Sequence, residues 1–288
     1  MELGGAEGDG PAEERAGTFT LLSDDDPASA SGNSDPAATS LTRDGYVKTN
    51  LTKWDLLRGT TYRKFRYDKF YHKQDAESFV RDFLNSEDVR RELLPEAGSE
   101  DVAEVCSFSA KPVKAVTTTM AFFDRLQQAG GVVRPNGQIV KCMDDYFEGF
   151  HVQDRLREVL LNEDNEFELD HGEVFTAEEK AEFLYKIFRH LAVGGSLCQF
   201  EDVLDPYLEV SKLVYKELLT VWRNPRTAKP EVASGVYEID QVKFRRRDGG
   251  GEEEELFPEH SAQNWLYVST DPFRRTCKAW LHRFKHHW

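Results

Sequence analysis

The spacing of hydrophobic positions changes along the chain and predicts where folded structure begins. From Met1 to Asp44 the sequence consists mainly of Gly, Ala, Ser, Asp, Glu and Pro, and its one apolar run is "TFTLL". Such a composition buries too little apolar surface to offset the entropy that is lost on ordering. We therefore predict a disordered, acidic, low-complexity leader over residues 1–44 and one globular domain over residues 45–288.

The first part of the domain contains both strand-like and helix-like patterns. Aromatic and charged residues alternate in "TTYRKFRYDKFYH", which favours a half-buried strand, whereas "DAESFVRDFLN" has helical spacing. A strand is expected at "GQIVKCMD" and a helix at "HVQDRLREVLLNED". These two periods within one domain indicate an α+β fold.

Two helical patterns flank a short glycine-bearing segment in the centre of the chain. The first begins at the capping box "TAEE", carries an apolar stripe and ends at Gly194-Gly195, with Glu182 expected to face water. The segment "SLCQFED" then has the length and apolar content of a central strand, and "DPYLEV" suits the start of a second helix. The centre is therefore predicted to be helix, strand, helix.

The C-terminal part changes to alternating strand patterns. "SGVYEIDQVKF", "NWLYVST" and "TCKAWLHRF" predict antiparallel strands, so the whole domain is expected to be α+β with a mixed sheet. Between the first two strands, "RRRDGGGEEEE" predicts a hairpin whose arginines and glutamates neutralise each other. A basic patch for a partner is the alternative interpretation of the same arginines.

Composition narrows the classes of partner. The formal net charge is −15 and the acidic residues are spread along the chain, which argues against nucleic acid or an anionic membrane as the main partner. The four cysteines have no C-x-x-C spacing, as expected for reduced thiols instead of disulfides or zinc ligands. Neither a signal peptide nor a membrane-spanning segment is expected, so the sequence predicts a soluble intracellular protein.

The glycine-bearing segment raises the question of an active site. A phosphate loop needs glycines ahead of a helix, where N–H groups converge on the anion, but here the glycines close a helix. A nucleophile at Cys198 would need a base, and His190 and Asp202 do not have the spacing of a known cysteine-enzyme family. His282 and His286 have metal-ligand spacing but lie in a strand-like tail. We therefore expect no catalytic residue, no metal and no cofactor.

Long stretches of the sequence resemble a known family. "EFLYKIFRHLAVGGSLCQFEDVLDPYLEVSKLVYKELLTVWRNP", together with "MAFFDRL", "GQIVKCMDDYF" and "YVSTDPFRR", is similar to the cilia- and flagella-associated protein 300 family from about Asn50 to the C-terminus. The resemblance implies a non-enzymatic protein of the cytoplasm and of the axoneme of motile cilia. It also implies a role in assembly of outer and inner dynein arms that depends on intraflagellar transport.

The resemblance suggests a mechanism in which the domain acts as an adaptor. It would bind dynein-arm complexes or their cytoplasmic assembly factors and help the transport machinery to deliver them into the cilium. The candidate contact residues on its surface are Glu201, Asp202, Arg274 and Arg275. Charge at such positions would set encounter rate and specificity more than affinity.

Two other classes of function stay open at this point. One is a small-ligand-binding or enzyme-like domain with a pocket beside the glycines that is formed by His190, Cys198 and Gln199. The other is a permanent structural subunit of the axoneme. A ligand that stabilises the fold would favour the first, and retention in salt-extracted axonemes would favour the second.

Overall fold

A large twisted sheet forms the middle of the computed structural model, which describes residues 16–22, 40–71, 75–94, 102–128, 131–147, 149–161, 174–246 and 253–284. Within these residues the sheet has seven strands, and all its pairs are antiparallel. In spatial order the strands are β1 (Phe19–Leu21), β2 (Thr60–Tyr67), β11 (Thr276–His282), β10 (Trp265–Asp271), β8 (Val236–Arg246) and β3 (Val102–Val113), with β9 (Glu253–Glu255) paired to β8.

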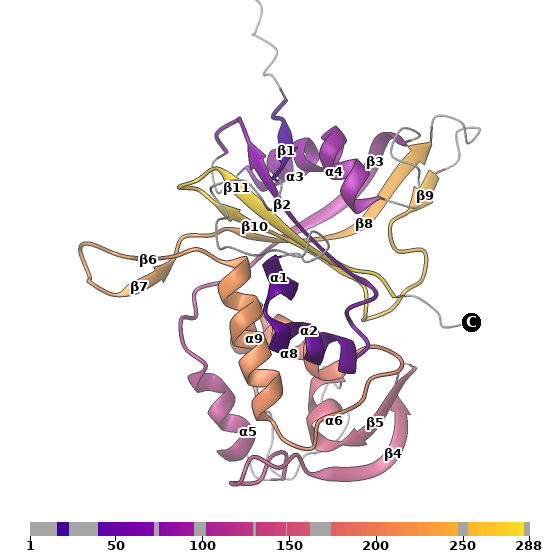
Figure 1. Ribbon diagram of the computed structural model, residues 1–288, viewed down its shortest axis with the longest axis vertical. Helices are drawn as coiled ribbons and strands as arrows, with labels where there is room; N and C mark the ends of the chain where they lie inside the picture. Colours follow the sequence, from indigo (N-terminus) through magenta and orange to yellow (C-terminus); the bar gives the residue numbers. More distant parts are fainter. Residues whose placement is uncertain are drawn as a thin grey trace, which may run out of the picture.

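Both faces of this sheet are covered by helices (Figure 1). Alternate residues of a strand point to opposite faces, so Trp265 and Tyr267 of β10 join one hydrophobic core while Leu266 and Val268 join the other. Helices α3 (Ala76–Asn85) and α4 (Glu87–Leu93) cover the second core. The first and larger core contains α2 (Gly45–Lys53), α6 (Arg155–Leu161), α8 (Phe183–Val193) and α9 (Asp205–Leu218).

The smaller elements lie around these layers. Two hairpins stand apart from the main sheet, and one of them projects from the body as an arm (Figure 1). The arm is β6 (Val221–Arg223) with β7 (Pro230–Val232), and the other hairpin is β4 (Lys141–Phe147) with β5 (Phe150–Asp154). The short helices are α1 (Ser40–Arg43), η3 (Ala121–Asp124), α5 (Arg125–Gln128) and α7 (Ala177–Lys180).

Several expectations from the sequence are confirmed. The fold is α+β, the strands β8, β10 and β11 form an antiparallel unit, and the capping box of Thr176 and Glu179 is present. The arginine and glutamate runs pair across β8 and β9, with ion pairs Arg246–Glu254 at 2.6 Å and Arg245–Glu253 at 3.5 Å. The tip of that hairpin lies outside the described residues. Charge neutralisation across the two strands therefore accounts for this motif.

Three expectations from the sequence are wrong. The segment "SLCQFED" is not a strand, because its N–H groups bind the turn after α2, as from Gln199 to the Lys53 carbonyl at 2.9 Å. The described pairs of the large sheet are antiparallel, so the sheet is not mixed. Glu182 is buried instead of facing water, because its carboxylate accepts the N–H groups of Val116 and Thr117 at 3.2 and 3.3 Å.

Part of the expected disordered leader forms regular structure. Residues Phe19–Leu21 are the edge strand β1, and Ser40–Arg43 are helix α1. The side chains of Phe19 and Leu41 supply the buried surface that the average composition of the leader did not suggest. Residues 1–15 and 23–39 lie outside the described residues.

Candidate functional site

The glycine-bearing segment between α8 and α9, residues 194–202, is held against the turn that follows α2; we call it the junction. Gly194 has a φ of +69°, and the Gly195 N–H donates to the Trp54 carbonyl at 2.8 Å. A Cβ at Gly195 would overlap the backbone of Asp55. The glycines therefore allow two chain segments to approach closely, and their N–H groups are not arranged around an anion site.

A buried arginine of helix α6 packs against the junction and stabilises it. Arg157 of α6 is 1% exposed, pairs with the buried carboxylate of Asp154 and donates to the Tyr207 hydroxyl at 2.7 Å. Its guanidinium carbon lies 3.4 Å from the centre of the Phe200 ring. The Tyr207 hydroxyl also accepts the Glu201 N–H at 3.0 Å. A buried charge that is compensated by several partners in this way serves the fold.

The two acidic candidate contact residues have different surroundings. Glu201 is buried, and its carboxylate accepts from Lys53 Nζ at 2.7 Å and from Trp54 Nε1 at 3.0 Å. The expectation that Glu201 is exposed is therefore wrong, because its negative charge satisfies an indole N–H inside the domain. The side chain of Asp202 is 82% exposed and pairs with Lys141 at 2.9 Å, and this hydrogen bond lowers the pKa of Asp202.

The three residues of the proposed pocket, His190, Cys198 and Gln199, have different surroundings. Burial raises the pKa of the Cys198 thiol to about 12, so the nucleophilic thiolate is scarce at neutral pH. His190 is stacked on Trp265 with ring centres 4.0 Å apart, and burial lowers its pKa. Gln199 is exposed. Three cavities of about 380 to 440 Å³ are lined by described residues, and none of these three includes any of the trio.

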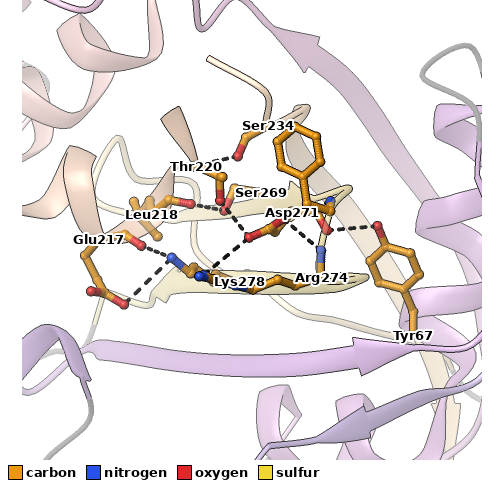
Figure 2. A network of polar contacts seen from close by, with 10 residues as sticks. Tyr67, Glu217, Leu218, Thr220, Ser234, Ser269, Asp271, Arg274 and Lys278 are labelled. Atoms are coloured by element: carbon orange, nitrogen blue, oxygen red, sulfur yellow. Dashed lines mark hydrogen bonds and ion pairs between the residues drawn. The ribbon is translucent and has the colours of Figure 1, made fainter. Parts of the chain in front are cut away.

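The turn between β10 and β11 is built on a network of polar contacts (Figure 2). Asp271 is buried at its start, and one carboxylate oxygen accepts the N–H groups of Phe273 and Arg274 at 3.0 and 3.1 Å. The other oxygen accepts the Thr220 hydroxyl at 2.9 Å. Because Thr220 lies between α9 and β6, Asp271 ties the turn to the base of the arm.

The network continues through β11 to the end of α9. Lys278 donates to the backbone carbonyl of Glu217 and lies 3.9 Å from its carboxylate, while Ser269 donates to the Leu218 carbonyl at 2.6 Å. Burial lowers the pKa of Lys278. Tyr67 of β2 donates to the Asp271 carbonyl at 3.4 Å, and burial raises its pKa to about 12. The turn is thus fixed to three elements that are distant in sequence.

This platform presents aromatic and basic side chains to solvent. Phe273 is 63% exposed and packs on the exposed Trp222 of β6, with ring centres 6.0 Å apart. Arg274 and Arg275 are exposed beside Phe273, and Arg223 is exposed beside Trp222. We call these exposed residues, Val221–Arg223 of β6 and residues 272–275 of the turn, the apex. Aromatic residues and arginine are the types that most often dominate protein–protein binding energy.

The candidate contact residues from the sequence do not form one surface. Asp202 lies just before α9 begins at Asp205, whereas the apex adjoins the other end of this helix of 14 residues. A helix of this length spans about 20 Å. Trp222 was missing from the candidates because no sequence pattern around it indicated a surface site. Its position in "LTVWRNP" gave no signal that it would meet Phe273.

The described part of the chain offers little to a metal or a membrane. It contains no group of three or more His, Cys, Asp or Glu side chains that could hold a metal ion. No helix within it is long and apolar enough to cross a bilayer. His282 is buried against Trp265, with ring centres 4.4 Å apart, and His286 lies outside the described residues.

Comparison with known proteins confirms the resemblance. The family described as "Cilia- and flagella-associated protein 300" matches residues 35–282. Over 256 residues the chain is 38% identical to the Chlamydomonas reinhardtii protein of that name, which covers 87% of this chain and 96% of the relative. A Paramecium tetraurelia protein of the same name is 29% identical over 225 residues, covering 78% and 82%. No solved structure gives a significant match. The chain belongs to the cilia- and flagella-associated protein 300 family.

Proposed function

We propose that this protein is a non-enzymatic adaptor for the assembly of outer and inner axonemal dynein arms. It binds preassembled arm complexes or their assembly factors in the cytoplasm, and intraflagellar transport carries the complex into the cilium. Family membership supports the ciliary setting of this proposal. The observation that carries the adaptor role is the apex, an exposed aromatic pair flanked by arginines on a rigid platform.

The apex is suited to binding because it is rigid before a partner arrives. The buried carboxylate of Asp271 fixes the backbone of the turn, and its contact with Thr220 fixes the base of the arm. Little conformational entropy is then lost when Phe273 and Trp222 are covered. Solvent-exposed rings of this size would otherwise be an unfavourable surface feature.

Charge at the apex indicates the chemistry of the partner. Arg223, Arg274 and Arg275 are exposed around the two rings, and Arg226 and Lys229 follow along the arm. This basic region stands on a chain with a formal net charge of −15. An acidic partner segment with an apolar anchor would therefore be oriented toward the apex, since the rest of the chain repels it on average.

The test is quantitative mass spectrometry of proteins that co-purify with the tagged full-length chain from cytoplasmic and ciliary extracts. The variant Trp222→Ala/Phe273→Ala removes both rings and leaves the Asp271 network in place. We expect dynein-arm subunits, assembly factors or transport proteins with the wild-type chain and at least a tenfold loss with the variant, as for hot-spot aromatics.

Asp202→Ala is the matched control, because Asp202 is exposed at the opposite end of α9. Glu201 is not a suitable surface probe, since it is buried. If no such protein is recovered with the wild-type chain, the adaptor role is wrong. If recovery is unchanged by the double variant, the apex is not the contact. If the chain stays with salt-extracted axonemes, a permanent structural role replaces transport.

A further inference from the structure

The N-terminal strand β1 lies in a slot that surrounds its backbone. On one side β1 pairs with the edge strand β2, with Phe19 opposite Tyr67 and Leu21 opposite Phe65. Beyond the strand, the Leu22 N–H donates to the Lys64 carbonyl at 2.9 Å. Figure 1 shows β1 beside α3 at the edge of the sheet. The slot is thus formed by the β2 edge and by the helices above it.

The backbone N–H groups on the side of β1 that faces away from β2 also have hydrogen-bond partners, and these partners are side chains. Three N–H groups donate to the α3–α4 region: Gly17 to Asp82 at 2.9 Å, Phe19 to Ser86 Oγ at 3.2 Å, and Leu21 to Asp88 at 2.8 Å. The Ser86 hydroxyl in turn donates to the Phe19 carbonyl at 2.8 Å. An edge strand normally leaves such groups to solvent, so the domain here provides a dedicated set of partners for an extended backbone.

One aromatic pocket binds the side chain of Phe19. Phe19 is 1% exposed, and its ring centre lies 5.3 Å from those of Phe79 and Phe83 in edge-on geometry. The rings of Tyr67 and Tyr71 complete the pocket at 5.8 and 6.1 Å. The neighbouring Thr18 and Thr20 are exposed. Leu21 is half-buried against the same core, and a Cβ at the buried Gly17 would overlap the Tyr71 hydroxyl. Recognition therefore depends mainly on the phenylalanine within an extended backbone, which is how strand-addition sites bind a peptide.

The slot lies within the region that matches the family, whereas the strand that fills it does not. The family match begins at residue 35, so it includes the slot residues between Phe65 and Asp88 but not the segment Gly17–Leu22. The domain shared by the family therefore carries the receptor, while the strand that fills it lies outside the matched region.

We propose that this slot is a second binding site, a receptor for an extended partner segment that carries a phenylalanine. The chain's own Gly17–Leu22 occupies it in cis and must be displaced before the partner segment enters. The ligand needs free N–H groups at the positions of Phe19 and Leu21, which excludes proline there.

The experiment uses the full-length chain with Phe19→Ala, which empties the aromatic pocket, and a fluorescent peptide with the sequence of residues 16–22. In anisotropy titrations we expect saturable binding to the variant and at least tenfold weaker binding to the wild-type chain. The weaker binding follows because the tethered segment competes at an effective concentration in the millimolar range. A peptide with alanine in place of the phenylalanine is expected not to bind.

A second substitution tests the backbone contacts. Ser86→Ala, added to Phe19→Ala, removes both contacts of the Ser86 hydroxyl with the bound strand and is expected to weaken peptide binding about tenfold. The apex is untouched in these variants, so their outcome is independent of the adaptor role. If the Phe19→Ala chain keeps its circular dichroism spectrum and does not bind the peptide, β1 is a fixed strand and the proposal is wrong.

Native-state hydrogen exchange of the wild-type chain keeps the proposal testable if Phe19→Ala does not fold. A displaceable strand opens without global unfolding, so the N–H groups of Phe19 and Leu21 should exchange at least tenfold faster than those in the middle of β11. Equal protection of β1 and β11 would mean that β1 leaves its slot only when the whole domain unfolds, which overturns the proposal.

Discussion

The two ends of helix α9 carry similar residue types in opposite roles. At its N-terminal end, the junction buries Arg157 and Glu201 among hydrogen-bond partners. At its C-terminal end, Asp271 is buried beneath the apex, whereas Arg274 and Phe273 are exposed. The comparison teaches that the surroundings of a charged loop residue decide whether it stabilises the fold or is available for binding. The residue type alone does not decide this.

The difference has a physical origin in the direction of the hydrogen bonds. At the junction the charges of Arg157 and Glu201 point into the domain, where removing one partner leaves the other unsolvated. At the apex the buried Asp271 carboxylate holds backbone N–H groups. The Arg274 guanidinium lies 3.8 Å from this carboxylate, but its side chain is 71% exposed. Four substitutions or changes of condition test this distinction, starting with the largest expected effect.

Arg157→Met should destabilise the protein most. The substitution fills a similar volume but leaves the buried Asp154 carboxylate without its cation, at a cost of about 3 to 5 kcal/mol in the free energy of unfolding. Urea unfolding followed by circular dichroism measures the loss. Arg81→Gln is the control, because the Arg81–Glu77 pair is 58% and 75% exposed and should contribute less than about 0.5 kcal/mol. Similar stability of both variants would contradict a structural role for Arg157.

Glu201→Ala should destabilise the protein more than Asp202→Ala, although the two acidic residues are adjacent in the sequence. Its loss leaves the buried Trp54 N–H without an acceptor and is expected to lower the free energy of unfolding by about 1 to 3 kcal/mol. Asp202→Ala should leave the midpoint of urea unfolding unchanged. A larger shift for Asp202→Ala than for Glu201→Ala would show that the junction is arranged differently.

Mild acid should lower the free energy of unfolding, because two buried histidines lie in the core on the junction side of the sheet. His190 and His282 both stack on Trp265, with ring centres 4.0 and 4.4 Å away, and burial lowers the pKa of His282 to about 4. The unfolded chain, with a histidine pKa of about 6.5, then binds more protons than the folded chain as the pH falls from 6.5 toward 4.

Stability that is present above pH 6.5 is therefore lost in this window. His282 alone should lower the free energy of unfolding by about 2 kcal/mol between pH 6.5 and pH 5. Urea titrations at the two pH values measure the change, and His282→Gln should reduce it. An identical pH dependence in the variant would show that His282 does not titrate in this way.

Arg275→Gly should have the smallest effect on stability. It should raise the free energy of unfolding slightly and weaken partner binding. Arg275 has a φ of +51°, a conformation that costs a non-glycine residue roughly 1 kcal/mol, so the variant should be up to about 1 kcal/mol more stable. It should also reduce co-purification of partners, since a cation leaves the apex. Gln241→Gly is matched, because exposed Gln241 has a φ of +50°. Equal partner recovery with both variants would exclude Arg275 from the contact.

Several features of the fold could be predicted from the sequence because they depend on neighbouring residues. The Thr176–Glu179 capping box links residues three positions apart, and the aromatic and β-branched content of Trp265–Asp271 is a property of one strand. The pairing of the arginine and glutamate runs needed only a short hairpin. The similarity to the family was also contained in contiguous stretches of sequence.

The candidate sites could not be predicted in the same way, because they depend on residues that are far apart in the chain. Trp54 and Glu201 are separated by 147 positions, Thr220 and Asp271 by 51, and Phe19 and Ser86 by 67. Composition averaged over residues 1–44 also concealed one phenylalanine that fits one pocket. The sequence by itself determined the local elements and the family, since these follow from short-range periodicity and capping. Only the tertiary structure decided which charges are buried, which rings meet at the apex and which segment fills the slot, because burial and contact are properties of the packed chain.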